Sequence, residues 1–284
     1  MIIGWFSCGV TSAVACKIAL SMYQDVELYY IDTGSQDPDS LRFLKECEQW
    51  YGQSIHILHS AQYADHFDVI EKKRFVNGPT GAACTYELKK KVRYDLQDSL
   101  GEWDGQVWGF DSGEEKRAQR FAEQNPITKP LFPLIEKGIT KENAAYMLEQ
   151  RGIGMPLMYR LGYRNNNCIG CVKGGMGYWN KIRVDYPECF RRMAALERKI
   201  GHACLKETVN GKTVPLFLDT LDPNRGDFPS EVIPCFVNWN LYMCNPPSGI
   251  KLKNHDKTRI NQGGRYCGPN ASFFRTVCCR SNDG

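Results

Sequence analysis

Short apolar runs alternate with amphipathic segments along the first part of the chain. Met1 to Phe6 is apolar, and residues 13–23 repeat apolar side chains at helical spacing, so we expect a strand followed by a helix. Residues 26–34 are typical of a buried parallel strand, and residues 40–52 of an amphipathic helix. The order strand, loop, helix, strand, helix therefore opens the chain.

The same alternation continues further along. Residues 54–60 predict a third strand, and residues 105–113 a fourth strand that leads into a charged helix over 114–124. Strands and helices that alternate in this way predict a parallel sheet with crossover helices, a doubly wound α/β domain. Ligands of such folds bind at the carboxyl ends of the strands. The loops expected there are residues 7–12, 32–39 and 110–114.

The character of the sequence changes after Pro130. Residues 141–152 and 187–201 have helical patterns, with a Gly- and Asn-rich stretch between them, and from about Pro246 the periodicity fails. We expect three parts. They are an α/β domain over residues 1–165, a smaller helical, cysteine-containing region over 166–244, and an irregular basic tail over 245–284.

Composition and charge are ordinary for a globular protein. Of the 284 residues, 42% are hydrophobic and 24% charged. The net charge of +4 is uneven, because the tail from Asn245 onward has seven basic residues against Asp256 and Asp283. A basic tail can attract phosphate backbones, but no aromatic side chains are spaced there for base stacking. We therefore favour the interpretation that the charge of the tail has no binding role.

Several features indicate a cytoplasmic protein. No apolar run approaches the roughly 20 residues that a membrane span needs, and the first residues lack the pattern of a signal peptide. We therefore expect no membrane partner. The 13 cysteines of such a chain are expected as reduced thiols or metal ligands rather than disulfides.

The loop SCGVTS, residues 7–12, follows the first strand and precedes a helix. Its backbone N–H groups and the positive end of the helix make an anion site, to which Ser7, Thr11 and Ser12 add hydroxyls. The alternative is a tight turn with an ordinary N-cap. The loop matches neither G-x-x-x-x-G-K-[ST] nor G-x-G-x-x-G, so it predicts a different kind of phosphate cradle.

Several separated motifs carry a resemblance. The strand with FSCGVTSAVA resembles the PP-loop of the adenine nucleotide alpha-hydrolase superfamily, and YYIDTGSQDPDSLRFLKECEQWYG is similar to a segment of the phosphoadenosine phosphosulfate reductase family. The same family has a Cys before a basic helix, as in ACTYELKKKVR. Its phage and bacterial members carry a motif close to NNCIGCVKGGMGYWNKIR. The resemblance covers roughly Met1 to Gly201.

The resemblance implies a five-stranded parallel sheet that binds ATP or a related adenine nucleotide at its carboxyl edge. Two positions depart from the family pattern: Cys8 replaces a glycine, and Thr11 stands where ATP pyrophosphatases have an aspartate. The residues that we expect at the nucleotide are Ser7, Cys8, Gly9, Thr11, Ser12, Asp32, Thr33, Gly34 and Gly109.

The cysteines form a second candidate site. Cys168 and Cys171 make a C-x-x-C knuckle, and Cys84 is the best third ligand because a helix N-terminus and a Lys-rich turn follow it and should lower its pKa. The resemblance implies that such cysteines can hold a four-iron (4Fe-4S) cluster, which Cys189 or Cys235 would close. Zinc, a redox dithiol and plain buried thiols are the alternatives.

Basic residues surround these motifs in the sequence. Lys89, Lys90 and Arg93 follow Cys84 on one expected helix, although a lysine run can also be a solvated face. We expect the catalytic residues to be Cys84, Lys89 and Arg117. The residues expected to bind phosphate or an acceptor are Lys90, Arg93, Arg120 and Lys173.

The motifs point to a nucleotide-dependent enzyme of sulfur metabolism. It would be a sulfonucleotide reductase with a thioredoxin-like reductant, or an ATP-using sulfurtransferase that modifies DNA or tRNA with a sulfur donor protein. The reductases use a C-terminal E-C-G-x-H string, which this sequence lacks, and Cys235 and the pair Cys278 and Cys279 are weak substitutes. Sulfur transfer is therefore favoured. The contrasting hypothesis is an inactive nucleotide- or nucleic-acid-binding protein whose cysteines form a structural metal knuckle.

Overall fold

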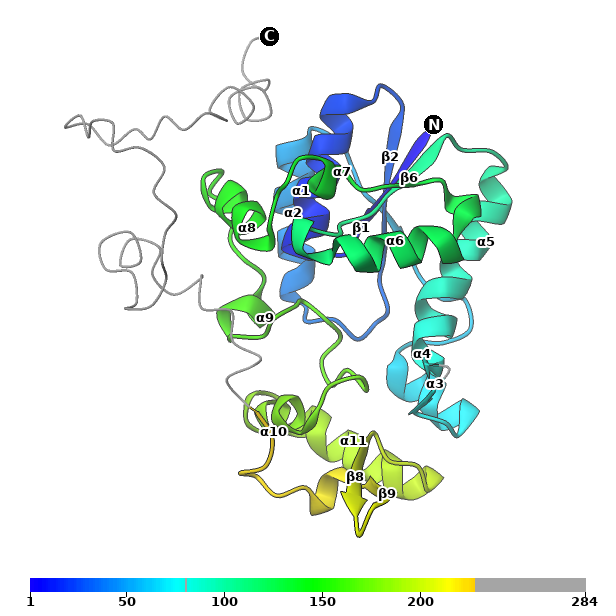
Figure 1. The fold of residues 1–284 in the computed structure, drawn as a ribbon, viewed down its shortest axis with the longest axis vertical. Helices are drawn as coiled ribbons and strands as arrows, with labels where there is room; N and C mark the ends of the chain where they lie inside the picture. Colours follow the sequence, from blue (N-terminus) through cyan, green and yellow to red (C-terminus); the bar gives the residue numbers. More distant parts are fainter. Residues whose placement is uncertain (80, 228–284) are drawn as a thin grey trace, which may run out of the picture. The chain divides into compact units, whose positions relative to one another are not determined.

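The computed structural model describes residues 1–79 and 81–227. Its centre is a five-stranded sheet in the order β3-β2-β1-β6-β7, and every neighbouring pair is parallel (Figure 1). The strands are β1 (Ile2–Phe6), β2 (Val26–Ile31), β3 (His56–Leu58), β6 (Gly105–Val107) and β7 (Pro130–Leu131). The predicted doubly wound, five-stranded α/β fold is confirmed.

Helices cover both faces of this sheet, which is why every residue of β1 is buried. Ile3 and Trp5 pack with Tyr29 and, across the sheet face, with Leu96 and Leu100 of α5. On the opposite face α1 contacts β1 and packs against α2, α7 and α8. The helices of this domain are α1 (Val10–Met22), α2 (Asp39–Tyr51), α5 (Lys91–Leu100), α6 (Glu115–Gln124), α7 (Pro133–Glu136) and α8 (Lys141–Glu149).

Two strands are shorter than their hydrophobic patterns predict. The third covers only His56–Leu58 instead of residues 54–60, and the fourth ends at Val107 instead of Gly113. After Val107 the chain enters a loop and the short 3-10 turn η2 (Ser112–Glu114), whose capping box is made by Asp111 and Glu114. A capping box requires a local turn, so it competes with extension of the strand. Two further 3-10 turns are η3 (Pro126–Thr128) and η4 (Leu218–Thr220).

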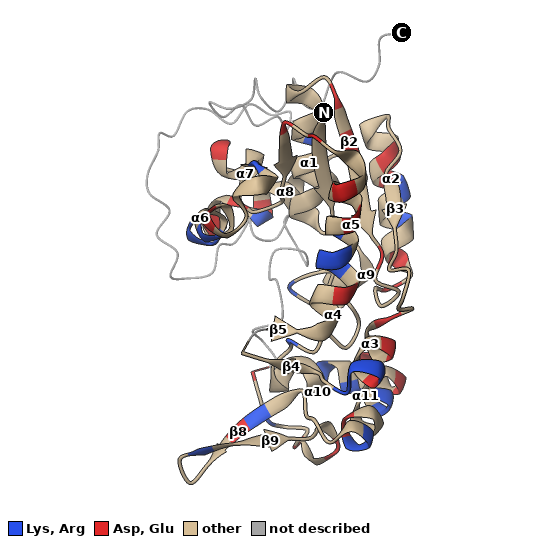
Figure 2. Ribbon diagram, turned by 90° about the vertical axis from the view of Figure 1, so that its right-hand side faces the viewer, with Lys and Arg blue, Asp and Glu red and all other residues tan. Residues whose placement is uncertain are grey.

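The helix predicted after Cys84 is confirmed, but its first part is irregular. The turn α4 (Ala83–Thr85) passes into the π-helical segment η1 (Tyr86–Lys90) and then into α5. Basic residues lie where α4 passes into α5 (Figure 2). π-helical turns occur frequently at functional sites. The elements before α4 are α3 (His66–Lys73), β4 (Asn77–Gly78) and β5 (Gly81–Ala82).

The second part of the described chain is mostly helical, as predicted, with its own hydrophobic cluster around Trp179, Ile182 and Met193. Its elements are α9 (Leu157–Arg160), α10 (Met176–Asp185), α11 (Pro187–Ile200), β8 (Leu205–Val209) and β9 (Lys212–Leu216). The antiparallel β8–β9 hairpin is absent from the sequence prediction. Its signal is the pair Asn210 and Gly211, which both have positive φ and form the tight turn.

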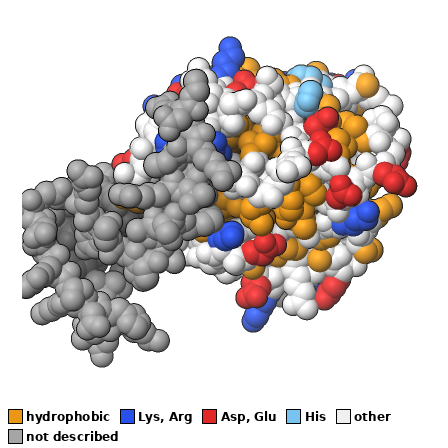
Figure 3. Space-filling view, turned by 90° about the horizontal axis from the view of Figure 1, so that it is seen from above, with side chains coloured by type: hydrophobic (Ala, Val, Ile, Leu, Met, Phe, Trp, Pro, Cys, Tyr) orange, Lys and Arg blue, Asp and Glu red, His pale blue; other side chains and the backbone are white. Residues whose placement is uncertain are grey.

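The chain divides into a unit over Met1–Ile233 and a unit over Pro234–Gly284, and all described residues belong to the first. The predicted boundaries after residues 165 and 244 stay predictions. The basic tail, Cys235, Cys278 and Cys279 lie outside the described residues. Within the described ranges no helix is long and apolar enough to cross a membrane. The face seen in Figure 3 mixes apolar side chains with charged ones of both signs.

Candidate functional site

The phosphate loop lies between β1 and α1, at the point of the sheet where the strand order reverses. β1 has β2 on one side and β6 on the other, so a crevice opens at its carboxyl end. The helix α1 begins after Gly9, whose backbone is extended, and no side chain caps its first turn. An uncapped helix N-terminus beside a parallel strand end is an anion site. The alternative of an ordinary side-chain N-cap does not hold here.

Ser12 holds this loop in shape. Its Oγ accepts hydrogen bonds from the backbone N–H of Ser7 (3.0 Å) and from the Ser7 hydroxyl (2.9 Å), and donates to the carbonyl oxygen of Gly9 (2.9 Å). Gly109, just beyond β6, presses against the same residue, since a Cβ there would lie 2.7 Å from the Ser12 nitrogen. The loop is therefore clamped between its own hydrogen bonds and the end of β6.

Cys8 is part of this loop but not of its binding surface. Its φ is +56°, in the left-handed region where the family pattern has glycine, and its side chain is fully buried. The Cys8 thiol donates to the carbonyl oxygen of Ser40 (3.5 Å), and Asn166 Nδ2 donates to the Cys8 carbonyl oxygen (2.9 Å). Burial raises the pKa of the Cys8 thiol far above its usual value. Cys8 thus supports the loop by packing.

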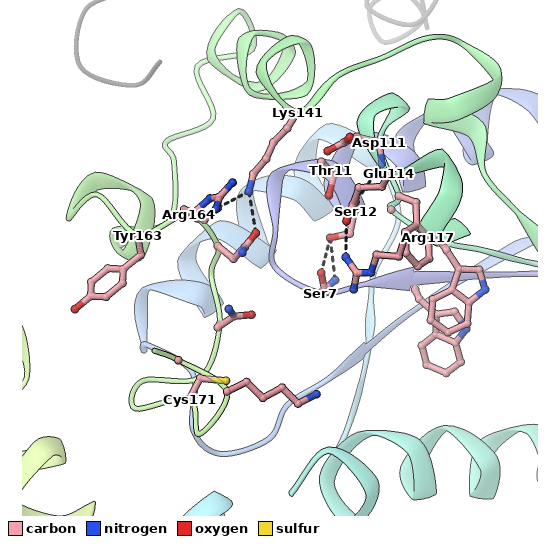
Figure 4. A pocket seen from close by; sticks show the side chains of 18 of the residues that line it. Ser7, Thr11, Ser12, Asp111, Glu114, Arg117, Lys141, Tyr163, Arg164 and Cys171 are labelled. Atoms are coloured by element: carbon pink, nitrogen blue, oxygen red, sulfur yellow. Dashed lines mark hydrogen bonds and ion pairs between the residues drawn. The ribbon is translucent and has the colours of Figure 1, made fainter. Parts of the chain in front are cut away.

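A cavity of about 650 Å³ opens beside the loop and is lined by Ser7, Thr11 and Ser12 (Figure 4). Four basic residues also line it: Arg117, Lys141, Arg164 and Lys173. The Lys141 ammonium donates to the carbonyl oxygen of Arg164 and to Asn165 Oδ1 (2.8 Å), and burial lowers its pKa. Arg117 pairs with Glu114 and lies 5.0 Å from the ring centre of Phe110. The predicted role of Arg117 beside phosphate is compatible with this position.

A second cavity of about 430 Å³ brings the phosphate loop and the cysteines together. Ser7, Gly9 and Thr11 line it together with all three predicted thiols, Cys84, Cys168 and Cys171. We call it the thiol cavity. Thr33 also lines it, and its Oγ1 lies 3.2 Å from Cys168 Sγ.

The predicted low pKa of Cys84 is wrong. Burial, and to a smaller extent the neighbouring Cys168 and Cys171, raise the pKa of Cys84 to about 11. Lys89 and Lys173 act in the opposite direction, as the sequence suggested, but they are outweighed. In the absence of a bound partner Cys84 is therefore a neutral thiol at pH 7.

The thiol cavity offers three sulfur donors for the cluster or the zinc ion that the sequence predicts. A zinc ion needs its sulfur ligands about 2.3 Å from one point. Among the described residues no three His, Cys, Asp or Glu side chains are placed to hold one ion, so zinc stays a prediction that the geometry does not support. An iron–sulfur cluster takes each thiolate at a separate corner, and three thiols around one cavity are suited to that. Cys84, Cys168 and Cys171 would hold it.

A third cavity, of about 300 Å³, is lined by Lys89, Lys90 and Arg93 and by no carboxylate. Arg93 is only 7% exposed, and its Nε has no hydrogen-bond partner among the described residues. Its guanidinium lies 5.1 Å from the ring centre of Trp108, and burial lowers its pKa. A buried cation without a counter-ion is costly unless an anion binds there. We call this the Arg93 cavity; Ser7 and Cys168 line it too.

Besides Cys8, three predicted residues do not line the phosphate-loop cavities. Asp32 Oδ1 accepts from the Gly34 N–H (2.8 Å) and shapes the turn after β2. Gly34 has φ +64°, and a Cβ there would meet the carbonyl oxygen of Ala64 at 1.9 Å, so the turn requires glycine. Arg120 is exposed on α6. Their binding roles stay predictions.

Sequence reasoning missed the aromatic pair Trp5 and Trp108, as well as Lys141 and His66. The two indole rings are 6.0 Å apart, and both line the first and third cavities. Trp5 could have been found because its indole N–H is the polar group of an otherwise apolar strand. Lys141 is the first residue of a helix far along the chain from the phosphate loop, and no motif around it predicts a role at the site.

The buried imidazole of His66 also has a nitrogen without a hydrogen-bond partner among the described residues. Its Nδ1 lies 2.7 Å from Ser35 Oγ, which itself donates to the Thr33 carbonyl oxygen. Nδ1 must therefore carry the proton, and Nε2, which has no partner among the described residues, is a lone-pair acceptor. Burial lowers the pKa of His66 to about 4. A neutral imidazole thus forms part of the wall of the thiol cavity.

The fold and these cavities define an α/β protein with a phosphate loop at the carboxyl edge of a parallel sheet and a set of thiols beside it. A family model described as phosphoadenosine phosphosulfate reductase domain matches residues 2–174, well over half of the chain. The chain therefore belongs to the phosphoadenosine phosphosulfate reductase family. This agrees with the resemblance that the motifs carry.

Comparison with individual proteins adds little to this. The chain is similar to a crystal structure of phosphoadenylyl-sulfate (PAPS) reductase from Candida auris in a phosphate complex, with 14% identity and a TM-score of 0.45. The likeness covers 59% of this chain and 80% of that one. No curated protein matches the chain.

Proposed function

We propose that this chain is an adenine-nucleotide-dependent enzyme of sulfur metabolism, in which the phosphate loop binds the nucleotide and Cys84 reacts with sulfur. The observation that carries the proposal is the shared thiol cavity, which has Ser7 and Thr11 on one side and Cys84 on the other. A nucleotide whose phosphates bind at the helix N-terminus would place its reactive end near the thiols.

The neighbouring residues have complementary parts in this proposal. Lys89 and Lys173 favour the thiolate of Cys84, and they offset part of the effect of burial. Arg117 presents a guanidinium to the cavity beside Thr11, where it can neutralise phosphate oxygens. A four-iron cluster held by Cys84, Cys168 and Cys171 would supply electrons or an iron atom that binds sulfur, and Cys84 would itself carry sulfur only in the form of the enzyme without a cluster.

The leading reaction is ATP-using sulfur transfer. The enzyme would transfer AMP from ATP to an oxygen of an acceptor in DNA or tRNA with loss of pyrophosphate, and a persulfide on Cys84, supplied by a sulfur donor protein, would then displace AMP and join the acceptor to Cys84 through a disulfide. Two electrons from a thioredoxin-like reductant would cleave this disulfide, which releases the thiolated acceptor and the Cys84 thiol. The sequence supports this by lacking the E-C-G-x-H string of the reductases. Lys90 and Lys173 at the cavities would face the polyanionic acceptor.

The second candidate is sulfonucleotide reduction, and the Arg93 cavity favours it. Three cations without a carboxylate suit one more anionic group of the ligand, apart from the group at the phosphate loop. A 3′-phosphate on the ribose is such a group, and ATP has none. In this case a thioredoxin-like reductant would supply the electrons that release sulfite.

A nucleotide panel on the full chain, purified without oxygen, separates the two. Calorimetric titrations would compare ATP, AMP and adenosine 3′,5′-bisphosphate. Tighter binding of ATP, with pyrophosphate release that needs a nucleic acid, supports sulfur transfer. Tighter binding of the bisphosphate, with sulfite release from phosphoadenylyl sulfate, supports reduction.

Variants test whether the chemistry uses the thiol cavity. Cys84→Ala should abolish turnover with either substrate and leave nucleotide affinity within about twofold. Cys47→Ala, which changes a buried thiol of α2, is the matched control. Nucleotide binding without turnover in any assay would contradict the proposal and support the inactive binding protein instead.

A further inference from the structure

Aromatic and basic side chains are exposed together on the helical segment that follows Cys84. Tyr86 is 52% exposed and Tyr94 is 38% exposed, and the exposed Lys89 and Lys90 stand between them in the sequence. We call these four residues the Tyr–Lys surface. It includes basic residues that Figure 2 shows where α4 passes into α5. Exposed apolar side chains are ordinary when they stand singly, but here two rings flank two cations on one helical segment.

The π-helical segment η1 brings the residues of this surface into line. In a regular α-helix, residues eight apart differ by about 80° in direction around the axis. η1 covers Tyr86–Lys90, and its wider turn rotates the chain by less per residue than an α turn does. Tyr86, Lys90 and Tyr94 therefore leave the helix in more nearly the same direction than a regular helix would allow.

The positive charges of the Tyr–Lys surface are not neutralised by neighbours. Lys91, the next residue, forms an ion pair with Asp95 (2.9 Å). Lys89 and Lys90 form no ion pair with any of the described residues. The exposed carboxylate of Asp98 marks the end of the surface on α5. The surface is therefore complementary to a polyanion.

The Tyr–Lys surface continues into the cavities of the candidate site. Lys90 lines the Arg93 cavity, and Lys89 lines both that cavity and the thiol cavity. The Arg93 guanidinium lies 5.0 Å from the ring centre of Tyr94 and 5.1 Å from that of Trp108. This cation between two rings connects the exposed tyrosine with the cavity wall. A chain molecule bound along the surface would therefore reach the thiol cavity past Lys89.

We propose that the Tyr–Lys surface binds an unpaired nucleic-acid strand, whose bases stack on the two tyrosine rings and whose phosphates contact the two lysines. Rings beside cations suit a single strand, because every base has a face that can stack and every link has a charge to neutralise. The bases of a duplex are already stacked on one another and paired. The inference rests on the proposed function and deepens it, because it makes the acceptor an unpaired strand and gives it a place on the protein.

The test is fluorescence anisotropy of labelled DNA and RNA strands of about 15 nucleotides, and of the matching duplexes, titrated with the full chain at several salt concentrations. A single strand should bind at least about tenfold more tightly than its duplex, and the tighter of the two strands identifies the acceptor. Tyr86→Ala and Tyr94→Ala should each weaken strand binding about tenfold without changing its salt dependence, because they remove stacking alone.

The lysines are tested by the salt dependence itself. Lys90→Gln should reduce the slope of log affinity against log salt concentration by about 0.7, because one phosphate contact is lost. Tyr146→Ala, which removes a tyrosine of α8 that is also 38% exposed, and Lys45→Gln, which removes an exposed cation of α2, are the matched controls. Neither should change binding. The basic tail is present in every variant, so its contribution cancels in these comparisons.

Three results would overturn the inference. They are equal binding of strand and duplex, wild-type strand affinity in both tyrosine variants with folding confirmed by circular dichroism, and equally tight binding of polyglutamate, a polyanion without bases. The pyrophosphate and sulfite assays are read separately. Sulfite release from phosphoadenylyl sulfate without strand binding would overturn the inference and leave the proposed function intact. Strand binding without turnover in any assay would do the reverse.

Discussion

The phosphate loop and the thiol cavity differ in how their residues are brought together. The loop consists of consecutive residues between β1 and α1, and its polar groups satisfy one another through Ser12. The thiol cavity draws Cys84 and the C-x-x-C pair from distant segments. Its wall contains the unpartnered Nε2 of His66, and the neighbouring Arg93 cavity contains the unpartnered Nε of Arg93. A preformed anion site therefore stands beside a region that lacks partners for its buried polar groups.

This difference indicates which of the two regions a bound ligand stabilises more. A loop whose two serine hydroxyls already bond to each other and to its backbone keeps its shape without one. Buried polar groups without partners cost about 1–3 kcal/mol each, and that cost falls when a ligand or ion supplies the missing contact. The thiol cavity and the Arg93 cavity should therefore be the parts that bound groups stabilise most.

Substitution of His66 has the largest expected effect, which is on the pH dependence of stability. Its folded pKa of about 4 lies below the unfolded value of about 6.5, so the unfolded chain takes up the proton first as the pH falls. Stability is complete above about pH 6.5 and falls by about 3 kcal/mol towards pH 4. His66→Gln should flatten this slope in urea unfolding at several pH values. Exposed His59→Gln is the control, and an unchanged slope in His66→Gln would refute the assignment.

Substitution of Gly109 tests whether the end of β6 holds the phosphate loop in shape. A methyl group at this position would overlap Ser12, so Gly109→Ala should destabilise by about 2 kcal/mol and weaken nucleotide binding about 30-fold. Gly175→Ala is the control, because its Cβ meets nothing within 4 Å in the same cavity. Normal nucleotide affinity in Gly109→Ala would show that the loop is not clamped by β6.

Arg93 separates stability from binding. Replacing a buried, unpaired cation by an apolar side chain of similar length removes a desolvation cost, so Arg93→Met should be about 1 kcal/mol more stable without ligand. The same variant should bind the preferred nucleotide about tenfold more weakly. Arg120→Met, on the exposed face of α6, should change neither. Lower stability with unchanged affinity would mean that Arg93 is only a structural residue.

Substitution of Cys8 has the smallest expected effect on stability. Because its φ is +56°, Cys8→Gly should be about 1 kcal/mol more stable than Cys8→Ala, although both lose the buried thiol. Denaturant unfolding of the two variants measures the difference. Equal stabilities would show that the left-handed backbone at Cys8 stores no strain.

The same contrast explains what the sequence predicts well. The phosphate loop and the sheet follow from consecutive residues, because period and turn chemistry act locally. β7 has two residues and no period, so only the resemblance supplied the fifth strand. Lys141 and His66 join their sites through long-range packing, which leaves no local signal. The prediction of a low pKa for Cys84 was wrong for the same reason, since the neighbouring lysines do not reveal how deeply the thiol is buried.

The central claim is that nucleotide and thiols share one cavity, and protection from alkylation tests it most directly. The full chain would be labelled with an isotope-coded alkylating reagent with and without saturating nucleotide, and the labelling rates of Cys84 and Cys189 read by peptide mass spectrometry. We expect nucleotide to slow labelling of Cys84 about tenfold or more and to leave Cys189, which lines a different cavity, unchanged. Equal labelling of Cys84 with and without bound nucleotide would contradict the account.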